Sequence, residues 1–138
     1  MEDERALALI STAQLASGIA GMAVAVRRRH PYDTPFMSGD EDSVARDSIT
    51  NGTALSAPVY MLAIQALSIG LLARRGSRAA ARSLGVLGGA MTCGYLIERL
   101  ARERLRPGGW EPTESSIAAS GILTAGAMVA LSLRCARG

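Results

Sequence analysis

Long stretches without charge alternate with short clusters of charged residues along the chain. Four stretches carry no charge: residues 6–26, 48–73, 83–97 and 115–133. A helix of about 20 apolar residues spans the roughly 30 Å of hydrocarbon in a bilayer, and arginines that follow such a stretch are typical of its end at the lipid headgroups. The pattern predicts an all-α integral membrane four-helix bundle, with transmembrane helices at roughly 6-29, 52-74, 82-105 and 114-134.

Two other interpretations of the apolar stretches fit less well. Ala23-Val24-Ala25 resembles a signal-peptide cleavage site, but residues 1–5 are mainly acidic where a signal peptide is positively charged. A water-soluble bundle needs polar residues every three or four positions, and the first, second and fourth stretches lack them. We therefore expect a multi-pass protein of the cell membrane.

Four crossings fix which polar segments share a side of the membrane. The 138 residues predict one transmembrane domain, 1-138, with polar loops 27-50 and 98-114 on one side. The loop between the second and third helices and both termini are expected on the other side. Any functional site is predicted near the two polar loops, because they hold most of the chemically reactive side chains.

Small residues recur at four-residue spacing in every predicted helix. They are Ala13, Ser17, Gly21 and Ala25 in the first, Ala66 and Gly70 in the second, Gly85, Gly89 and Cys93 in the third, and Gly121, Ala125, Gly126 and Ala130 in the fourth. Such stripes allow helices to approach closely in lipid. We expect them to pack the bundle or to contact a second copy or a partner membrane protein. Pro58 is expected near the start of the second helix if Asn51-Gly52 breaks the chain before it.

Two amides and one acid lie in or beside the predicted spans. Gln14 and Gln65 are expected to hydrogen-bond to neighbouring helices, because an unpaired amide in hydrocarbon is costly. Glu98 follows an apolar run, and an acid near membrane depth is a functional candidate. The structural alternative, which we favour, pairs Glu98 with Arg102 and Arg99 with Glu103 along a continuing helix.

The loops offer few candidates for chemistry. His30 is the only histidine, and Asp33, three residues later, suggests an orienting pair for general-base catalysis, although a polar residue at a helix end explains His30 better. The acidic residues 40–42 lack the spacing of a calcium loop. Trp110 is expected to anchor the chain at the membrane interface. We predict no catalytic, cofactor-binding or metal site.

The charge of +3 is carried by arginines spread between the apolar stretches. Because they form no single basic face, we expect the lipid bilayer, and no nucleic acid, as partner. Every basic residue is arginine, which favours a GC-rich bacterial source. Loops 27-50 and 98-114 hold eight arginines and the other side seven, so the distribution of positive charge predicts no single orientation.

Two functions remain open from the sequence. The first is a non-enzymatic accessory or interaction protein, or one that binds lipid or another hydrophobic small molecule. The second is a small transporter or channel, formed by a homodimer of oppositely inserted copies, in which Glu98 or the two glutamines line a polar path.

Overall fold

The computed structural model describes residues 1–138 and is all-helical, as the sequence predicts. Its helices are α1 (Glu2–Arg28), α2 (Val44–Thr50), α3 (Val59–Arg75), α4 (Arg78–Ile97), α5 (Arg99–Leu105) and α6 (Pro112–Arg137), with short 3₁₀ turns at Glu41–Ser43 and Pro107–Gly109. There are no strands. α1 and α6 are long and apolar enough to cross a membrane by length and composition.

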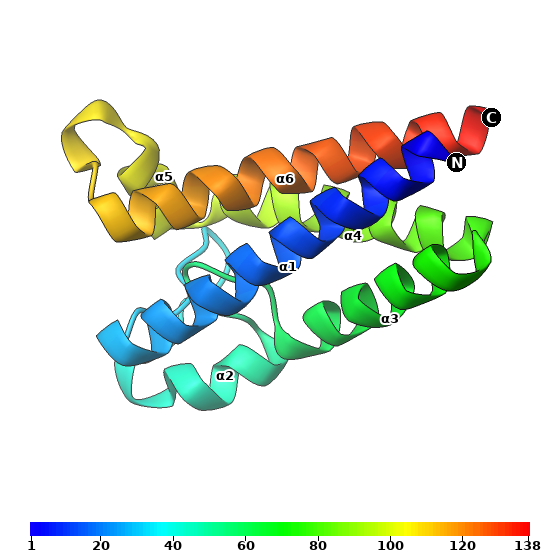
Figure 1. Ribbon diagram of the computed structural model, residues 1–138. Coiled ribbons are helices and arrows are strands. Elements are labelled where there is room, and N and C mark those ends of the chain that lie inside the picture. The colour runs from blue at the N-terminus through cyan, green and yellow to red at the C-terminus, as the bar shows by residue number, and fades with distance from the viewer.

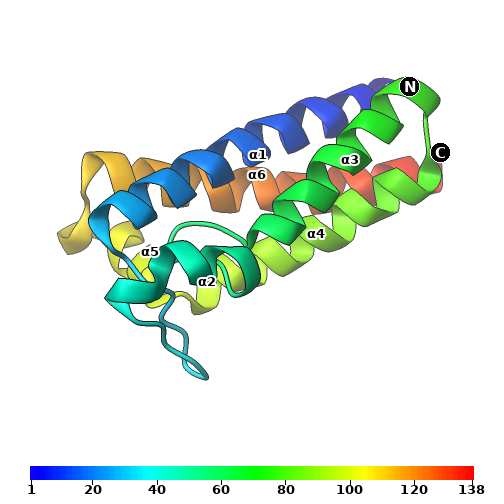
Figure 2. The same cartoon turned by 90° about the horizontal axis from the view of Figure 1, so that it is seen from below.

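The four long helices lie side by side (Figures 1 and 2). α6 packs against α1 and α4, and α3 packs against the same two helices from the other side. Both chain termini and the short α3–α4 turn lie at one end of the molecule. The segment 29–58, α5 and the turn before α6 lie at the opposite end, so residues far apart in the sequence meet there.

The second long helix starts later than predicted. The expected helix at 52-74 begins only at Val59, because Pro58 cannot donate a backbone hydrogen bond and stands as its N-cap. Before it, Gly52 adopts a positive φ of 83° and turns the chain. Residues 53–56 are buried, and Leu55 is fully enclosed. Pro58 is therefore near the helix start, as expected, and the residues before it form part of the interior.

The third predicted helix, 82-105, is two helices. α4 ends at Ile97, and Glu98 has an extended ψ of 124°. The backbone N–H of Arg99 donates to the carbonyl of Asp33 at 2.9 Å, in place of a carbonyl of its own helix. The loop after α1 thus provides the acceptor for the Arg99 N–H that a continuous α4 would have provided. The helix therefore ends, and α5 starts after Glu98 as a separate helix.

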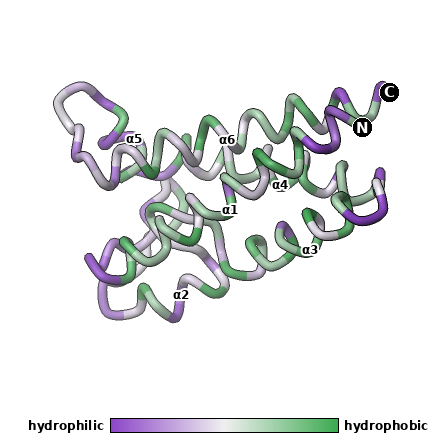
Figure 3. Tube along the Cα trace, in the orientation of Figure 1, coloured by the Kyte–Doolittle hydropathy of each residue, from purple (hydrophilic) through white to green (hydrophobic).

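The long helices bury an apolar core that includes Leu7, Leu84 and Met128, and they enclose several polar side chains as well. The enclosed polar side chains of the long helices are Ser11, Gln14, Gln65, Ser68, Glu114, Ser115 and Ser132. In contrast, Leu67, Val86 and Leu123 are 70%, 74% and 72% exposed. Charged residues gather at the two ends of the molecule, and apolar residues dominate the middle (Figure 3).

Several glycines mark places where helices touch. A Cβ on Gly21 would collide with the carbonyl of Leu55, and one on Gly121 would collide with Tyr95. In α4 two positions are tight: a Cβ on Gly85 would collide with the side chain of Ser132, and one on Gly88 would lie 2.7 Å from the carbonyl oxygen of Ala125. Of the stripe predicted through Gly85, Gly89 and Cys93, Gly85 makes close helix contact, whereas a Cβ on Gly89 would meet only Val129 at an ordinary 3.9 Å.

Candidate functional site

Two buried glutamates stand at the loop end of the molecule. Glu98 lies between α4 and α5 and is 5% exposed, and Glu114 lies in the first turn of α6 and is 1% exposed. Glu98 follows the charge-free residues 83–97, and Glu114 precedes the charge-free residues 115–133. Carboxylates are rarely this buried unless they are paired, so their partners indicate their roles.

The Glu114 carboxylate accepts hydrogen bonds from side chains in three parts of the chain. One oxygen accepts hydrogen bonds from Arg28 of α1 and from His30 Nε2, both at 2.7 Å, and the other accepts from Arg104 of α5 at 2.6 Å. Burial raises the pKa of Glu114, but the hydrogen bonds from Arg104, Arg28 and His30 outweigh burial and lower it to about 2. Glu114 is therefore an ionised structural hub.

The local sequence explains the position of Glu114. Pro112 occupies the first turn of α6, and the side chain of Glu111 caps the helix by accepting the N–H of Glu114 at 2.7 Å. A carboxylate in the first turn is also stabilised by the helix dipole. The residues Glu-Pro-Thr-Glu are a local pattern typical of a helix start, and this pattern could have located Glu114. Neither Glu114 nor its partners Arg28 and Arg104 were predicted as site residues.

Glu98 has no cationic partner. Its two oxygens accept the backbone N–H of Asp33 at 3.0 and 3.1 Å. The nearby guanidinium of Arg99 is engaged by Glu103 at 2.9 Å and by Asp33 at 3.5 Å. Burial raises the pKa of Glu98 to about 7, although the Asp33 N–H lowers it in part. Glu98 is thus a buried acid without a counter-charge.

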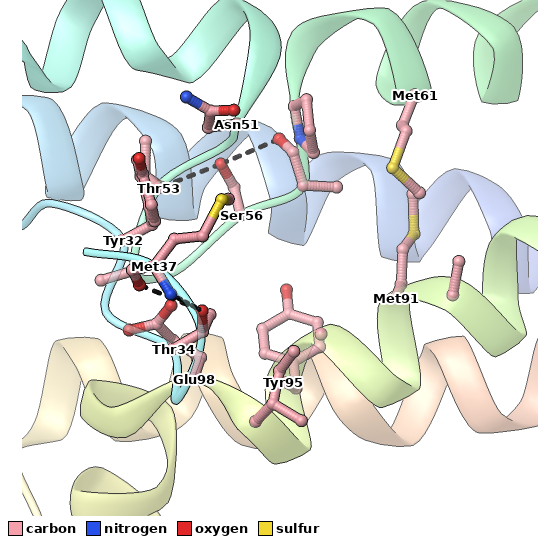
Figure 4. A pocket seen from close by; sticks show the side chains of 16 residues that line it. Tyr32, Thr34, Met37, Asn51, Thr53, Ser56, Met61, Met91, Tyr95 and Glu98 are labelled. Atoms are coloured by element: carbon pink, nitrogen blue, oxygen red, sulfur yellow. Dashed lines mark hydrogen bonds between the residues drawn. The ribbon is translucent and has the colours of Figure 1, made fainter. Parts of the chain in front are cut away.

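Glu98 borders a cavity of about 190 Å³ between the loop after α1, α3 and α4. The cavity is partly open, and its lining includes Tyr32, Met37, Met61, Met91 and Tyr95. Met61 and Met91 extend toward each other from α3 and α4, and Tyr95 and Glu98 lie toward the other side (Figure 4). The Tyr95 hydroxyl donates to the carbonyl of Leu55 at 3.4 Å.

A second hollow, of about 180 Å³, is open to the surface and shares lining residues with the first. It is lined mainly by polar residues, among them His30, Asp33, Arg99 and Glu103. Glu98 and Ala54 border both hollows. Glu98 is therefore a lining residue of a mainly apolar cavity and of a mainly polar hollow.

The side-chain pairs predicted in the loops are partly wrong. Arg99 pairs with Glu103 as expected, but Glu98 does not pair with Arg102, because the helix breaks at Glu98 and Arg102 is exposed. His30 binds Glu114 and not Asp33, which faces Arg99.

The two glutamines hydrogen-bond between helices as predicted. Gln65 Nε2 of α3 donates to Gln14 Oε1 and to the carbonyl oxygen of Ser11 in α1, both at 2.8 Å. Both side chains are enclosed, so the pair holds α1 and α3 together. Trp110 is 59% exposed at the loop end.

Neither metal binding nor similarity to other proteins assigns a function. No group of three or more His, Cys, Asp or Glu side chains is placed to hold a metal ion. The chain matches no protein family, no curated protein and no solved structure.

Proposed function

We propose that the protein crosses a membrane four times through α1, α3, α4 and α6 and acts there without catalysis, as an accessory protein or as a binder of an apolar small molecule. The charge-free parts of the four helices are the proposed spans, so Glu98 and Glu114 lie outside the hydrocarbon, at the loop end. The charge-free parts of α3 and α4 are residues 59–73 and 83–97, about 22 Å each, and the arginine side chains that flank them reach from the hydrocarbon edge to the headgroups.

The distribution of polarity carries this proposal. Large apolar side chains point outward on all four long helices: Leu9, Ile19, Val59, Tyr60, Ile64, Leu67, Leu71, Val86, Leu96, Ile97, Leu123 and Leu133. Contiguous apolar surface on a protein marks a site of contact with a membrane or another protein. The interior combines an apolar core with Gln14, Gln65, Ser68 and Ser132, which hydrogen-bond between helices where hydrocarbon offers no partners.

A binding role is supported by the cavity beside Glu98. Ligand sites are concave and mostly apolar, with few polar groups that orient the ligand, and this cavity has that composition. Glu114, in contrast, already accepts three side-chain hydrogen bonds, from Arg28, His30 and Arg104. It is therefore assigned to holding the loop end together.

Single cysteines test the proposed crossings. After Cys93 and Cys135 are replaced by serine, a cysteine is placed at Met37, Ser77, Gly108 or Gly138 and treated with a membrane-impermeant maleimide. We expect Met37 and Gly108 to react from one side, and Ser77 and Gly138 from the other. Reaction of all four sites from one side, or recovery of the protein without membranes, contradicts four crossings.

A transport function is the second proposal, because Glu98 borders two hollows of different polarity. Its opposed-homodimer form requires insertion in both orientations. Two reporters fused at Gly138, one active only outside the cytoplasm and one fluorescent only inside it, distinguish the cases. If both reporters are active, the opposed homodimer is favoured. If only one reporter is active, the protein inserts in a single orientation and the opposed homodimer is excluded.

A further inference from the structure

The lining of the larger cavity combines one acid with soft apolar and aromatic groups. Glu98 is the only ionisable carboxyl among its lining residues, and Tyr32 and Tyr95 contribute rings. Methionine side chains adapt to the shape of a ligand, and tyrosine faces attract cations. This set of groups matches a molecule with an apolar body and one positive charge.

The charge of Glu98 is not balanced by the protein. The nearest guanidinium, that of Arg99, lies between Asp33 and Glu103 and so is shared by two other carboxylates. A buried carboxylate without a cation is costly, and it is stabilised either by a proton or by a cation that enters the site. The backbone N–H of Asp33 occupies part of the carboxylate and leaves lone pairs for another donor.

The size of the cavity limits the apolar part of a ligand. Cavities of roughly 150 Å³ hold benzene in other proteins, and this one has about 190 Å³. A single ring or a short branched chain therefore fits between Met61, Met91 and Tyr95, with its charged end at Glu98.

We propose that this cavity binds a small organic ammonium ion, with the ammonium group on Glu98 and a ring-sized apolar group against Met61, Met91 and Tyr95. This assignment rests on the proposed binding role, for which it names the class of ligand. An ammonium ion donates hydrogen bonds to the carboxylate and replaces the missing counter-charge.

Benzylammonium and benzyl alcohol are matched probes, because they share the ring and differ in charge. Binding is measured by calorimetry on the full chain in detergent at pH 8, where Glu98 is ionised. We expect benzylammonium to bind at least tenfold more tightly than the alcohol. Glu98→Gln should remove this preference, and Glu103→Gln, which changes a carboxyl outside the cavity, should keep it.

Ala57→Leu locates the apolar part of the site, since Ala57 lines the cavity and a larger side chain fills it. Both probes should bind more weakly to this variant. The assignment is overturned if Ala57→Leu leaves the affinity for both probes unchanged. It is also overturned if Glu98→Gln still binds benzylammonium more tightly than benzyl alcohol. If benzyl alcohol binds as tightly as benzylammonium, the cation is wrong while an apolar binding role stands. Binding of neither probe also overturns the assignment, and the cysteine labelling pattern then shows independently whether the four crossings stand.

Proton release gives a second readout at Glu98. The ionisable and charged groups around this carboxyl are Tyr32, Asp33 and His30 of the loop, Tyr95 of α4, and Arg99 and Glu103 of α5. At pH 6 an ammonium that displaces the proton of Glu98 should release close to one proton, measured from the heats in two buffers of different ionisation enthalpy. No proton release at pH 6 contradicts contact between the ammonium and Glu98, and Glu98→Gln should abolish the release.

Discussion

Glu98 and Glu114 are two buried acids at the same end of the molecule, and their surroundings give them opposite properties. Glu114 receives charged hydrogen bonds from Arg28 and Arg104, so its ionised form is stabilised and its pKa falls to about 2. Glu98 has only backbone N–H donors, those of Asp33, Leu100 and Arg99, so burial dominates and its pKa rises to about 7. The number of cationic donors, and not burial alone, decides the charge of a buried carboxyl here.

The raised pKa of Glu98 predicts a loss of stability between pH 5 and 8. Its pKa rises from 4.5 to about 7 on folding, so the folded chain retains a proton that the unfolded chain releases. The stabilisation is complete below pH 4.5 and is lost as the pH rises through 7, with an upper value of about 3 kcal/mol. Glu98→Gln should remove this dependence and should be the more stable form at pH 8.

Thermal unfolding in detergent at pH 5 and pH 8 measures this difference. Glu114, whose pKa is lowered to about 2, titrates below this window and does not contribute. Glu103→Gln is the control, because its carboxyl is partly exposed and pairs with Arg99. Equal pH dependence in Glu98→Gln and the parent would contradict the role of Glu98.

Helix positions could be predicted from sequence where a local residue pattern determines them. They could not be predicted where contacts with residues distant in the sequence determine them. Charge-free runs located α1 and α6, whereas α3 begins at Val59 and not at the predicted residue 52, because Pro58 stands as its N-cap. The break at Glu98 depends on a backbone hydrogen bond from Arg99 to Asp33, 66 residues earlier in the chain, which no local pattern contains. For the same reason the contact between His30 and Glu114, 84 residues later, could not be predicted from the neighbours of His30 in the sequence.

The contact between α4 and α6 depends on Gly88. A Cβ at this position would lie 2.7 Å from the Ala125 carbonyl oxygen and 2.8 Å from the Met128 Cβ, so Gly88→Ala must push the helices apart. Overpacking of this kind costs roughly 1–3 kcal/mol. We expect a lower unfolding temperature in detergent for Gly88→Ala.

Gly126→Ala is the matched control in α6. No heavy atom lies within 4 Å of a Cβ at Gly126, so the change adds helix propensity without a collision. Its unfolding temperature should stay the same or rise. A Gly88→Ala protein as stable as Gly126→Ala would show that α4 and α6 do not pack as closely as the structure has them.

Along the middle of the long helices, the molecule is apolar both inside and outside. Its core of leucine, methionine and alanine encloses a few polar side chains, among them Gln14 and Gln65, which meet at 2.8 Å, while Leu67 and Val86 are largely exposed. In water the outer leucine and valine side chains would remain exposed to solvent and would gain nothing from burial. In a bilayer the same outer surface contacts lipid, and the interior amides find partners that lipid does not provide.

Arginine at Leu123 separates these two environments. Leu123 lies near the middle of the charge-free part of α6 and is 72% exposed. In water a change at such a position shifts stability by at most about 0.5 kcal/mol, whereas arginine at the centre of a membrane helix costs roughly 2.5–3.5 kcal/mol on insertion. We expect Leu123→Arg to reduce the fraction of protein that resists carbonate extraction from membranes.

Leu133→Arg provides the comparison at the end of a helix. Leu133 is also exposed, but it precedes Arg134 at the end of the charge-free part of α6, where a long arginine side chain reaches the headgroups. It should therefore insert as the parent does. If Leu123→Arg and Leu133→Arg insert and accumulate equally, α6 does not lie in hydrocarbon at Leu123, and the outward apolar side chains of α6 must be covered by a partner and not by lipid.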